Sequence, residues 1–190
     1  ASTIDLSATT NGLTVTTAAG ADTVTSGAGD DIIRTGAGAD LVIAGAGDDN
    51  ILMDTGADVA EFLSANFDGD DTVDGGADTD TIKITNTATV VVGDFANVTN
   101  VETLLLSGAG AQNVTLGTDA DNAGIVTVTA TAGTASTIDL SATTNGLTVT
   151  TDVGADTVTS GAGDDIIQTG ADADSVIAGA GDDNIQMGTG

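Results

Sequence analysis

Aspartate and glycine recur together at a spacing of nine residues in the first third of this chain. Three successive units read Gly-x-Gly-x-Asp-x-apolar, and they occupy residues 27–33, 36–42 and 45–51. Glycine allows the left-handed backbone of a tight turn, and the turn brings main-chain carbonyl oxygens close to a short carboxylate. A site with only oxygen donors suits a hard cation such as calcium, which takes about six to eight oxygen ligands. One turn cannot fill that shell, so we expect adjacent turns to share an ion.

The regular spacing resembles the calcium-binding nonapeptide repeat of RTX proteins, Gly-Gly-x-Gly-x-Asp-x-apolar-x. The first glycine of that motif is replaced here by Ser26, Thr35 and Ala44. Asp54 also stands in a turn-glycine position, which we interpret as a sign that the run is ending. The resemblance implies a parallel β-roll in which two nonapeptides form one turn and aspartates two units apart share calcium. The implied pairs are Asp22–Asp40, Asp31–Asp49, Asp40–Asp58, Asp156–Asp174 and Asp165–Asp183.

A second copy of the pattern follows later in the chain. Residues 135–190 repeat residues 1–56 without a gap, at an offset of 134, with seven differences. One difference replaces the turn glycine Gly38 by Asp172, which weakens the expected site at Asp174. We interpret the near-identity as a tandem duplication. The sequence shows no obvious capping segment at either end of the pattern, so we expect it to continue end to end.

The candidate calcium ligands are the aspartates that keep the nonapeptide register. They are Asp22, Asp31, Asp40, Asp49, Asp58, Asp71, Asp80, Asp156, Asp165, Asp174 and Asp183. Turn carbonyls are expected near Gly20, Gly27, Gly29, Gly36, Gly38, Gly45, Gly47, Gly154, Gly161, Gly163, Gly170, Gly179 and Gly181. The acids that precede some of these aspartates (Asp30, Asp48, Asp164 and Asp182) are interpreted as solvated turn residues, and Asp119 and Asp121 as loop residues.

The expected fold class is all-β, a parallel β-roll or β-solenoid with calcium-bound Gly-Asp turns, interrupted by a Thr/Val-rich β segment. The divisions are residues 1–17 (two leading strands), 18–80 (calcium-binding roll), 81–134 (Thr/Val-rich segment) and 135–190 (second copy). Within the roll, residues 59–67 break the register. We expect a loop or short helical turn there with buried phenylalanines, the alternative being an exposed contact patch. The segment 81–134 is either further solenoid or a separate sandwich.

The composition supports cation binding and disfavours several other functions. The chain has 29 acidic residues against 2 basic ones, for a net charge of −27, and only Glu61 and Glu102 of the acids are glutamate. Such charge repels itself and also repels nucleic acid and anionic membranes. The apolar core of a nonapeptide is thin, so we expect these segments to be unfolded without calcium and to fold on binding several ions. The sequence has no histidine or cysteine, and we do not expect an enzyme.

Two functions fit these features. The first is a calcium-dependent extracellular structural protein that builds a fibre, S-layer or adhesin stalk and associates with identical subunits or neighbouring repeats. Residues 95–104 also resemble a stretch that follows RTX runs in bacterial S-layer proteins. The resemblance implies a secreted protein of the bacterial cell surface, exported by type I secretion. No apolar run approaches the roughly 18 residues needed to cross a bilayer, so we expect no membrane insertion. The alternative is an adhesin module that binds ice or polysaccharide through Thr-x-Thr strands.

Overall fold

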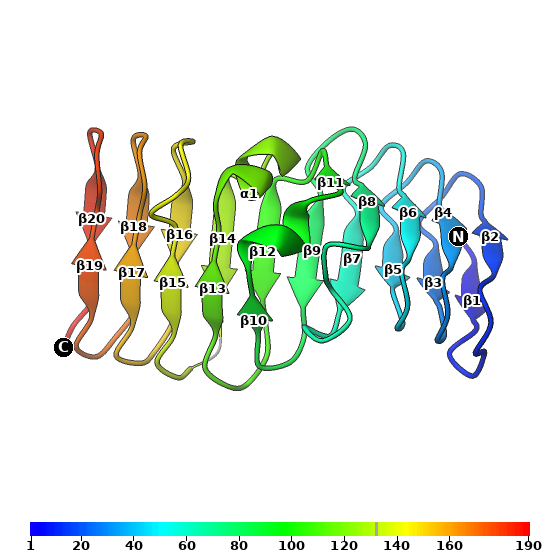
Figure 1. Cartoon of the computed structure of the whole chain (residues 1–190), viewed down its shortest axis with the longest axis horizontal. Helices are drawn as coiled ribbons and strands as arrows, with labels where there is room; N and C mark the ends of the chain where they lie inside the picture. Colours follow the sequence, from blue (N-terminus) through cyan, green and yellow to red (C-terminus); the bar gives the residue numbers. More distant parts are fainter. Residues whose placement is uncertain (132) are drawn as a thin grey trace.

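The chain forms a rod of stacked parallel turns. The structure, a computed structural model, describes residues 1–131 and 133–190. One continuous ten-stranded parallel sheet, sheet A, runs the length of the rod (Figure 1). Its strands in spatial order are β1 (Thr3–Asp5), β3 (Thr23–Thr25), β5 (Leu41–Ile43), β7 (Val59–Phe62), β9 (Thr81–Ile84), β12 (Thr103–Leu106), β14 (Thr127–Ala130), β16 (Thr148–Thr150), β18 (Ile166–Gln168) and β20 (Asn184–Gln186).

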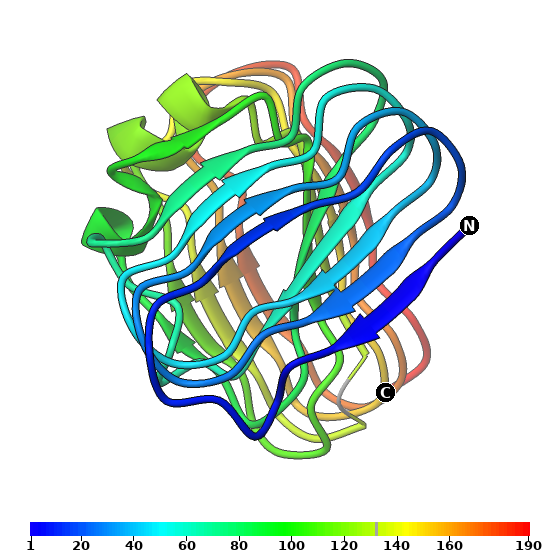
Figure 2. The same cartoon turned by 90° about the vertical axis from the view of Figure 1, so that its right-hand side faces the viewer.

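Two five-stranded parallel sheets close the turns, one in each half of the rod. Sheet B has the strands β2 (Thr14–Thr16), β4 (Ile32–Arg34), β6 (Asn50–Leu52), β8 (Thr72–Asp74) and β11 (Val98–Thr99). Sheet C has the strands β10 (Thr89–Val90), β13 (Asn113–Thr115), β15 (Thr137–Asp139), β17 (Thr157–Thr159) and β19 (Ser175–Ile177). Figure 2 shows the successive turns one behind another around a common interior. The predicted all-β parallel solenoid is therefore confirmed.

Most of the nonapeptide strands have three residues and bury only the central side chain, while β19 and β20 at the end of the rod bury none. In β3 the central Val24 is fully buried, while Thr23 and Thr25 point outward, as the alternation of a strand requires. The next turn along sheet A places Val42 directly beside Val24. The core of these turns is thus one apolar residue deep on each sheet.

The segment 81–134 continues the same solenoid and is not a separate sandwich. Its strands β9, β12 and β14 pair within sheet A, and each has four residues with two of them buried. One turn carries three strands, β9, β10 and β11, with the 3-10 helix η1 (Val92–Phe95) between the last two. A second helix, α1 (Thr118–Ala123), follows β13. The expected loop at Asp119 and Asp121 is wrong, because both residues lie in α1.

The register break at residues 59–67 also differs from the expectation. Residues 59–62 form strand β7 of sheet A and not a loop or helical turn. The longer connection after β7 lets the phenylalanines pack inward, and their burial is confirmed. The ring of Phe67 lies 5.1 Å from that of Phe62 and 5.3 Å from that of Phe95, measured between centroids, and all three are buried.

Asp54 does not end the run. It adopts a left-handed backbone with a φ of 64° and so takes over the role of the missing glycine. The turn that follows pairs Thr55 with both Ala37 and Ala77 on the adjacent turns, and the solenoid continues through β7.

The two copies of the duplicated sequence occupy opposite positions in the solenoid. Strand β1 lies in sheet A, but its counterpart β15 lies in sheet C. Strand β2 lies in sheet B, but its counterpart β16 lies in sheet A. The turn between the copies that has three strands accounts for the exchange. Its additional strand shifts every later strand by one position around the rod, and so moves it to the other face. Within the described residues, the helices are all too short or too polar to cross a membrane.

Candidate metal centre

Each register aspartate stands immediately before a strand, at the point where the glycine turn ends. On the edge where the strands of sheet A begin, the first column contains Asp22, Asp40, Asp58 and Asp80. On the edge where the strands of sheet B begin, the second column contains Asp31, Asp49 and Asp71. In the second copy, Asp165 and Asp183 precede strands of sheet A, and Asp156 and Asp174 precede strands of sheet C. We call these positions the ladder.

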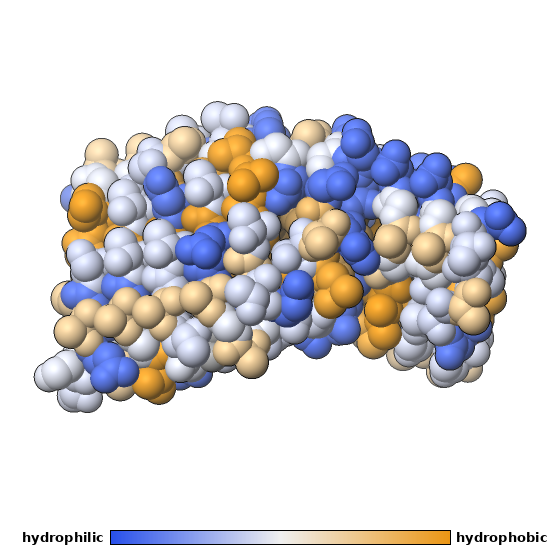
Figure 3. Space-filling model, turned by 60° about the horizontal axis from the view of Figure 1, so that its bottom comes forward, coloured by the Kyte–Doolittle hydropathy of each residue, from blue (hydrophilic) through white to orange (hydrophobic). Residues whose placement is uncertain are grey.

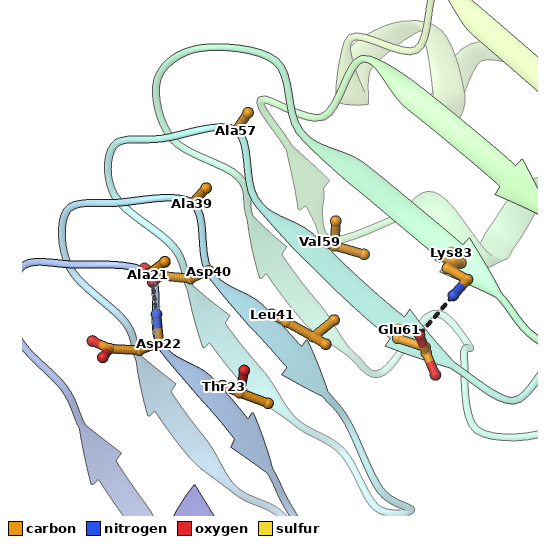
Figure 4. Close-up of a pocket in the computed structure, with 10 residues that line it drawn as sticks. All are labelled: Ala21, Asp22, Thr23, Ala39, Asp40, Leu41, Ala57, Val59, Glu61 and Lys83. Atoms are coloured by element: carbon orange, nitrogen blue, oxygen red, sulfur yellow. Dashed lines mark hydrogen bonds and ion pairs between the residues drawn. The ribbon is translucent and has the colours of Figure 1, made fainter. Parts of the chain in front are cut away.

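Hydrogen bonds join the ladder aspartates from one turn to the next. The backbone N–H of seven of them donates to Oδ1 of the aspartate on the following turn, and Figure 4 shows this for Asp22 and Asp40. All five pairs expected from the sequence lie on adjacent turns. The N···Oδ1 distances are 2.7 Å for Asp22 to Asp40, 2.6 Å for Asp40 to Asp58, 2.8 Å for Asp58 to Asp80, 2.9 Å for Asp31 to Asp49, 3.0 Å for Asp49 to Asp71, 3.0 Å for Asp156 to Asp174 and 3.0 Å for Asp165 to Asp183.

The turn backbone explains why glycine dominates beside the ladder. Gly47 has a φ of +120°, and a Cβ added there would lie 2.6 Å from the carbonyl carbon of Gly29 on the preceding turn. Stacked turns therefore leave no room for a side chain. Asp172 replaces one such glycine and still adopts a left-handed φ of 92°. Asp174 consequently keeps its place in the ladder, since its Oδ1 accepts from the N–H of Asp156.

The second oxygen of most ladder carboxylates is buried without a partner. Among the described residues, no hydrogen bond reaches Oδ2 of Asp31, Asp40, Asp49, Asp58, Asp80, Asp156, Asp165 or Asp174. A buried carboxylate that lacks a partner is strongly disfavoured unless it is protonated or neutralised by a cation. The orphaned oxygens, arranged one per turn in each column, thus fit rows of hard cations.

The titration of these carboxylates reflects the same burial. Desolvation is the largest cause that raises the pKa of four of them to about 6, and the neighbouring acids add to it. These four are Asp49, Asp58, Asp71 and Asp80. At the first turn, by contrast, a hydrogen bond with Thr17 lowers the pKa of Asp22. Negative charge is therefore least compensated by the protein itself at these later members of the two columns.

Carbonyl oxygens must supply part of any coordination shell. Within residues 1–131 and 133–190, no cluster of three or more acidic, histidine or cysteine side chains is found. The carbonyls of Gly27 and Gly36 already accept hydrogen bonds from Ala46 and Thr55 on the next turn, with N···O distances of 3.0 and 3.4 Å. Calcium commonly combines carboxylate and carbonyl donors, so a pair of ladder aspartates plus turn carbonyls matches its chemistry.

The acids next to the ladder are exposed, in line with the sequence interpretation. Asp30, Asp48, Asp164 and Asp182 all lie at the surface. The N–H of Asp48 donates to Oδ1 of Asp30 over 3.1 Å, and that of Asp182 to Oδ1 of Asp164 over 2.9 Å. They increase the negative charge around the turns without entering the buried row.

Two ladder residues were missed from the sequence. The N–H of Asp80 donates to Oε2 of Glu102 over 2.9 Å, so Glu102 continues the first column. On sheet C, the N–H of Ala88 donates to Oε1 of Gln112 over 2.8 Å, so Gln112 holds the same position as a neutral residue. Gln112 carries a sequence signal, because residues 108–114 keep the Gly-x-Gly-x-Asp-x-apolar spacing with Gln in place of Asp. Glu102 is marked only by its position directly before a short strand, as the register aspartates are.

A shallow groove runs over the outer face of sheet A beside the first column. Figure 4 shows Thr23, Leu41 and Val59 side by side on its floor, and Lys83 paired with Glu61 at its end. The Lys83 ammonium lies 3.0 Å from Oε2 of Glu61. The groove is on the opposite face of the sheet from the core, and the ladder residues Asp22 and Asp40 also line it where the strands begin.

The fold and the ladder define a parallel β-solenoid with oxygen donors for metal ions at its turns. A model of the RTX calcium-binding nonapeptide repeat (4 copies) matches residues 15–59, 67–82 and 150–185, just over half of the chain. The chain therefore belongs to the RTX calcium-binding nonapeptide repeat family, as its sequence predicted. A comparison with curated proteins found no match.

Proposed function

We propose that this protein is a calcium-dependent structural solenoid of the bacterial cell surface, in which calcium converts an extended chain into a stiff rod. Ions would be held by the ladder aspartates together with carbonyls of the glycine turns. The observation that carries the proposal is the row of buried, unpartnered Oδ2 atoms on successive turns. Each bound ion would neutralise carboxylates on two turns and so tie those turns together.

Folding would be coupled to calcium because the nonapeptide turns have little else to stabilise them. A fully buried Val or Ile contributes about 1.5–3 kcal/mol, while ordering the backbone costs about 1–2 kcal/mol per residue. A nonapeptide buries one such residue in its strand. The binding free energy of the ions is then part of the folding free energy, as in other metal-dependent domains.

The proposed setting is extracellular. RTX repeats are typical of secreted bacterial proteins, which is consistent with type I export of an unfolded, calcium-free chain. Outside the cell, calcium would fold the repeats into a fibre, S-layer or adhesin stalk that associates with identical subunits or with neighbouring repeats. The proposal assigns the chain no catalytic role.

Sedimentation velocity with calcium and after chelation tests this function. We expect a compact or assembled species with calcium and a slower, expanded one after chelation. Large species that form only with calcium support a fibre or lattice, whereas a compact monomer supports a stalk. A sedimentation profile that is the same with calcium and after chelation would refute the calcium-dependent fold.

A second candidate function is recognition of a repetitive surface such as polysaccharide or ice. The specific observation is a straight column of small polar residues on the outer face of sheet C. Strand register aligns Thr89, Asn113, Thr137, Thr157 and Ser175, all exposed. Neighbouring members are separated by about 4.8 Å, the spacing of adjacent strands. In Figure 3 the strongly hydrophobic residues form small, scattered groups on one side of the rod, and a row of moderately hydrophobic residues runs along its length at the lower left.

The Thr-x-Thr strands themselves do not form one array. They are distributed over all three sheets, and only Thr127–Ala130 and Thr148–Thr150 are neighbours. The sheet C column is therefore the surface to test. The variant Thr157→Lys should abolish co-sedimentation with insoluble polysaccharide or the shaping of ice crystals, while Thr16→Lys on sheet B should not. Absence of binding by the unaltered protein would dismiss this candidate.

A further inference from the structure

The first ladder column does not stop at the last matched nonapeptide. In the first half of the chain the family match ends at residue 82, yet the next turn continues the ladder with Glu102. Asp58 donates its N–H to Asp80 over 2.8 Å, and Asp80 donates its N–H to Glu102 over 2.9 Å. The column ends one turn later, where Val126 precedes strand β14. Glu102 is thus its last carboxylate.

The connection before Glu102 differs from a nonapeptide turn. Strand β11 ends at Thr99 and β12 begins at Thr103, so the connection is much shorter than the glycine turn that precedes Asp80. The additional methylene of glutamate lets the carboxylate reach the ladder position from this shorter backbone. Asn100 adopts a left-handed φ of 54° in the connection.

Oxygen donors converge on the space beside Gly75. The point at which a Cβ on Gly75 would stand lies 2.0 Å from the carbonyl oxygen of Asn100 and 2.7 Å from Oδ2 of Asp80. Both oxygens therefore lie close together on the same side of Gly75, where the stacked backbone leaves no space for a side chain. Asp80 is fully buried, and its Oδ2 has no hydrogen-bond partner among the described residues.

The charge of Glu102 is not needed for the hydrogen bonds of the ladder. Gln112 fills the equivalent position on sheet C as an amide, and its Oε1 accepts from the N–H of Ala88. Its Nε2 donates to the carbonyls of Gly108 and Gly110, so the protein satisfies the whole side chain. An amide would serve equally well at residue 102 if the role were only structural.

We infer that Asp80, Glu102 and the carbonyl of Asn100 form a calcium site outside the nonapeptide repeats, at the end of the first column. This inference rests on the proposed calcium-dependent function of the ladder. The site would join the last repeat turn to the three-stranded turn that follows it. It would therefore anchor the calcium-dependent part of the rod to its central segment.

Counting calcium ions in the variant Glu102→Gln tests the inference. Glutamine keeps the hydrogen-bond acceptor for Asp80 but removes the charge. Native mass spectrometry at saturating calcium counts the ions on compact charge states separately from unfolded ones, so even a partly folded variant gives a count. The matched control is Glu61→Gln, which changes the only other glutamate, located on the outer face of sheet A beside Lys83.

We expect Glu102→Gln to carry one ion fewer than the unaltered protein, and Glu61→Gln to carry the same number. An equal count in Glu102→Gln, confirmed by equilibrium dialysis, would overturn the Asp80–Glu102 site while leaving the repeat sites intact. If the unaltered protein binds no calcium at all, the proposed function itself fails. The two failures are therefore distinguishable.

Discussion

The two oxygens of a ladder carboxylate have different roles. Oδ1 accepts a backbone hydrogen bond from the preceding turn and fixes the side chain, as between Asp31 and Asp49. Oδ2 is buried without a partner in the described protein. Because an asparagine could provide the first role but not a second anionic donor, substitution of one residue separates the structural from the metal-binding contribution.

The variant Asp49→Asn should weaken calcium-dependent folding. Its Oδ1 can still accept from Asp31, but the buried negative charge is lost. Changes in the outer shell of metal sites alone reduce affinity by about 10–100-fold, so we expect the calcium midpoint of folding to rise by at least about tenfold. Calcium titration monitored by far-UV circular dichroism measures this shift.

Asp48→Asn is the matched control for Asp49→Asn. Asp48 is adjacent in sequence but exposed, and a surface charge change of this kind should alter the midpoint only slightly. Equal shifts in the two variants would indicate that general charge, and not a buried ligand, controls folding.

The stability of the calcium-free fold should decrease as the pH rises. Four ladder aspartates have a folded-state pKa of about 6, raised from an ordinary value of 3.8 mainly by desolvation. The folded chain then binds more protons than the unfolded chain between about pH 4 and 6. Their favourable contribution is full below about pH 4 and is lost as the pH rises through 6.

Urea unfolding in calcium-free buffer at pH 4.5 and pH 7.0 measures this dependence. We expect more folded protein at pH 4.5 than at pH 7.0. The calcium affinity should fall as the pH is lowered from 7.0 to 4.5, because protons compete for the same oxygens. A calcium-free chain that is more stable at pH 7.0 would contradict the burial of charged, uncompensated carboxylates.

At the level of the turn, stacking limits what the sequence can accept. A side chain at Gly47 would need both a left-handed backbone and space that the backbone of Gly29 occupies. The variant Gly47→Ala should therefore destabilise the calcium-loaded protein by about 1–3 kcal/mol, the usual cost of forcing extra atoms into a packed site. Thermal unfolding at saturating calcium checks this value.

Gly93→Ala provides the comparison. No atom lies within 4 Å of a Cβ built at Gly93, and its φ is not left-handed. We expect its thermal midpoint to stay close to that of the unaltered protein. If Gly47→Ala were tolerated equally well, the turns would not be stacked as closely as the structure describes.

The nonapeptide phase predicted the turns, strands and ladder, because a nine-residue unit has room for one turn and one inward-pointing residue. It could not predict the exchange of faces between the two copies. Ile33 in sheet B and Ile167 in sheet A have the same sequence context and are both fully buried. A nonapeptide fits either face of the rod equally well. The turn with three strands determines which face each later nonapeptide joins, and it lies in a segment where the nonapeptide pattern is no longer recognisable.

Glu102 and Gln112 escaped prediction for a related reason. Glu102 occupies a ladder position without a glycine turn in front of it, whereas Gln112 follows the glycines Gly108 and Gly110 but is an amide where the motif has Asp. The ladder position of Glu102 can therefore be identified only from the pairing of strands that are far apart in sequence, and not from composition or motif spacing.

Over the whole rod, apolar core and carboxylate ladder are concentrated in different segments. In the central block, residues 81–149, strands β9, β12 and β14 each bury two side chains, twice the number in a nonapeptide strand. Beyond Glu102, its ladder positions hold uncharged residues such as Gln112, Val126 and Leu147. The central block thus has more hydrophobic stabilisation and fewer buried charges than the runs on either side.

Removing calcium should consequently unfold the rod in parts. We expect backbone amides of residues 81–149 to stay protected from hydrogen exchange after chelation, while those of residues 18–58 and 150–185 exchange rapidly. Hydrogen–deuterium exchange with mass spectrometry resolves these segments, and the calcium-loaded protein should be protected throughout. Loss of protection along the entire chain would mean that the central block depends on the flanking ions. Protection retained everywhere would mean that the buried carboxylates do not require calcium.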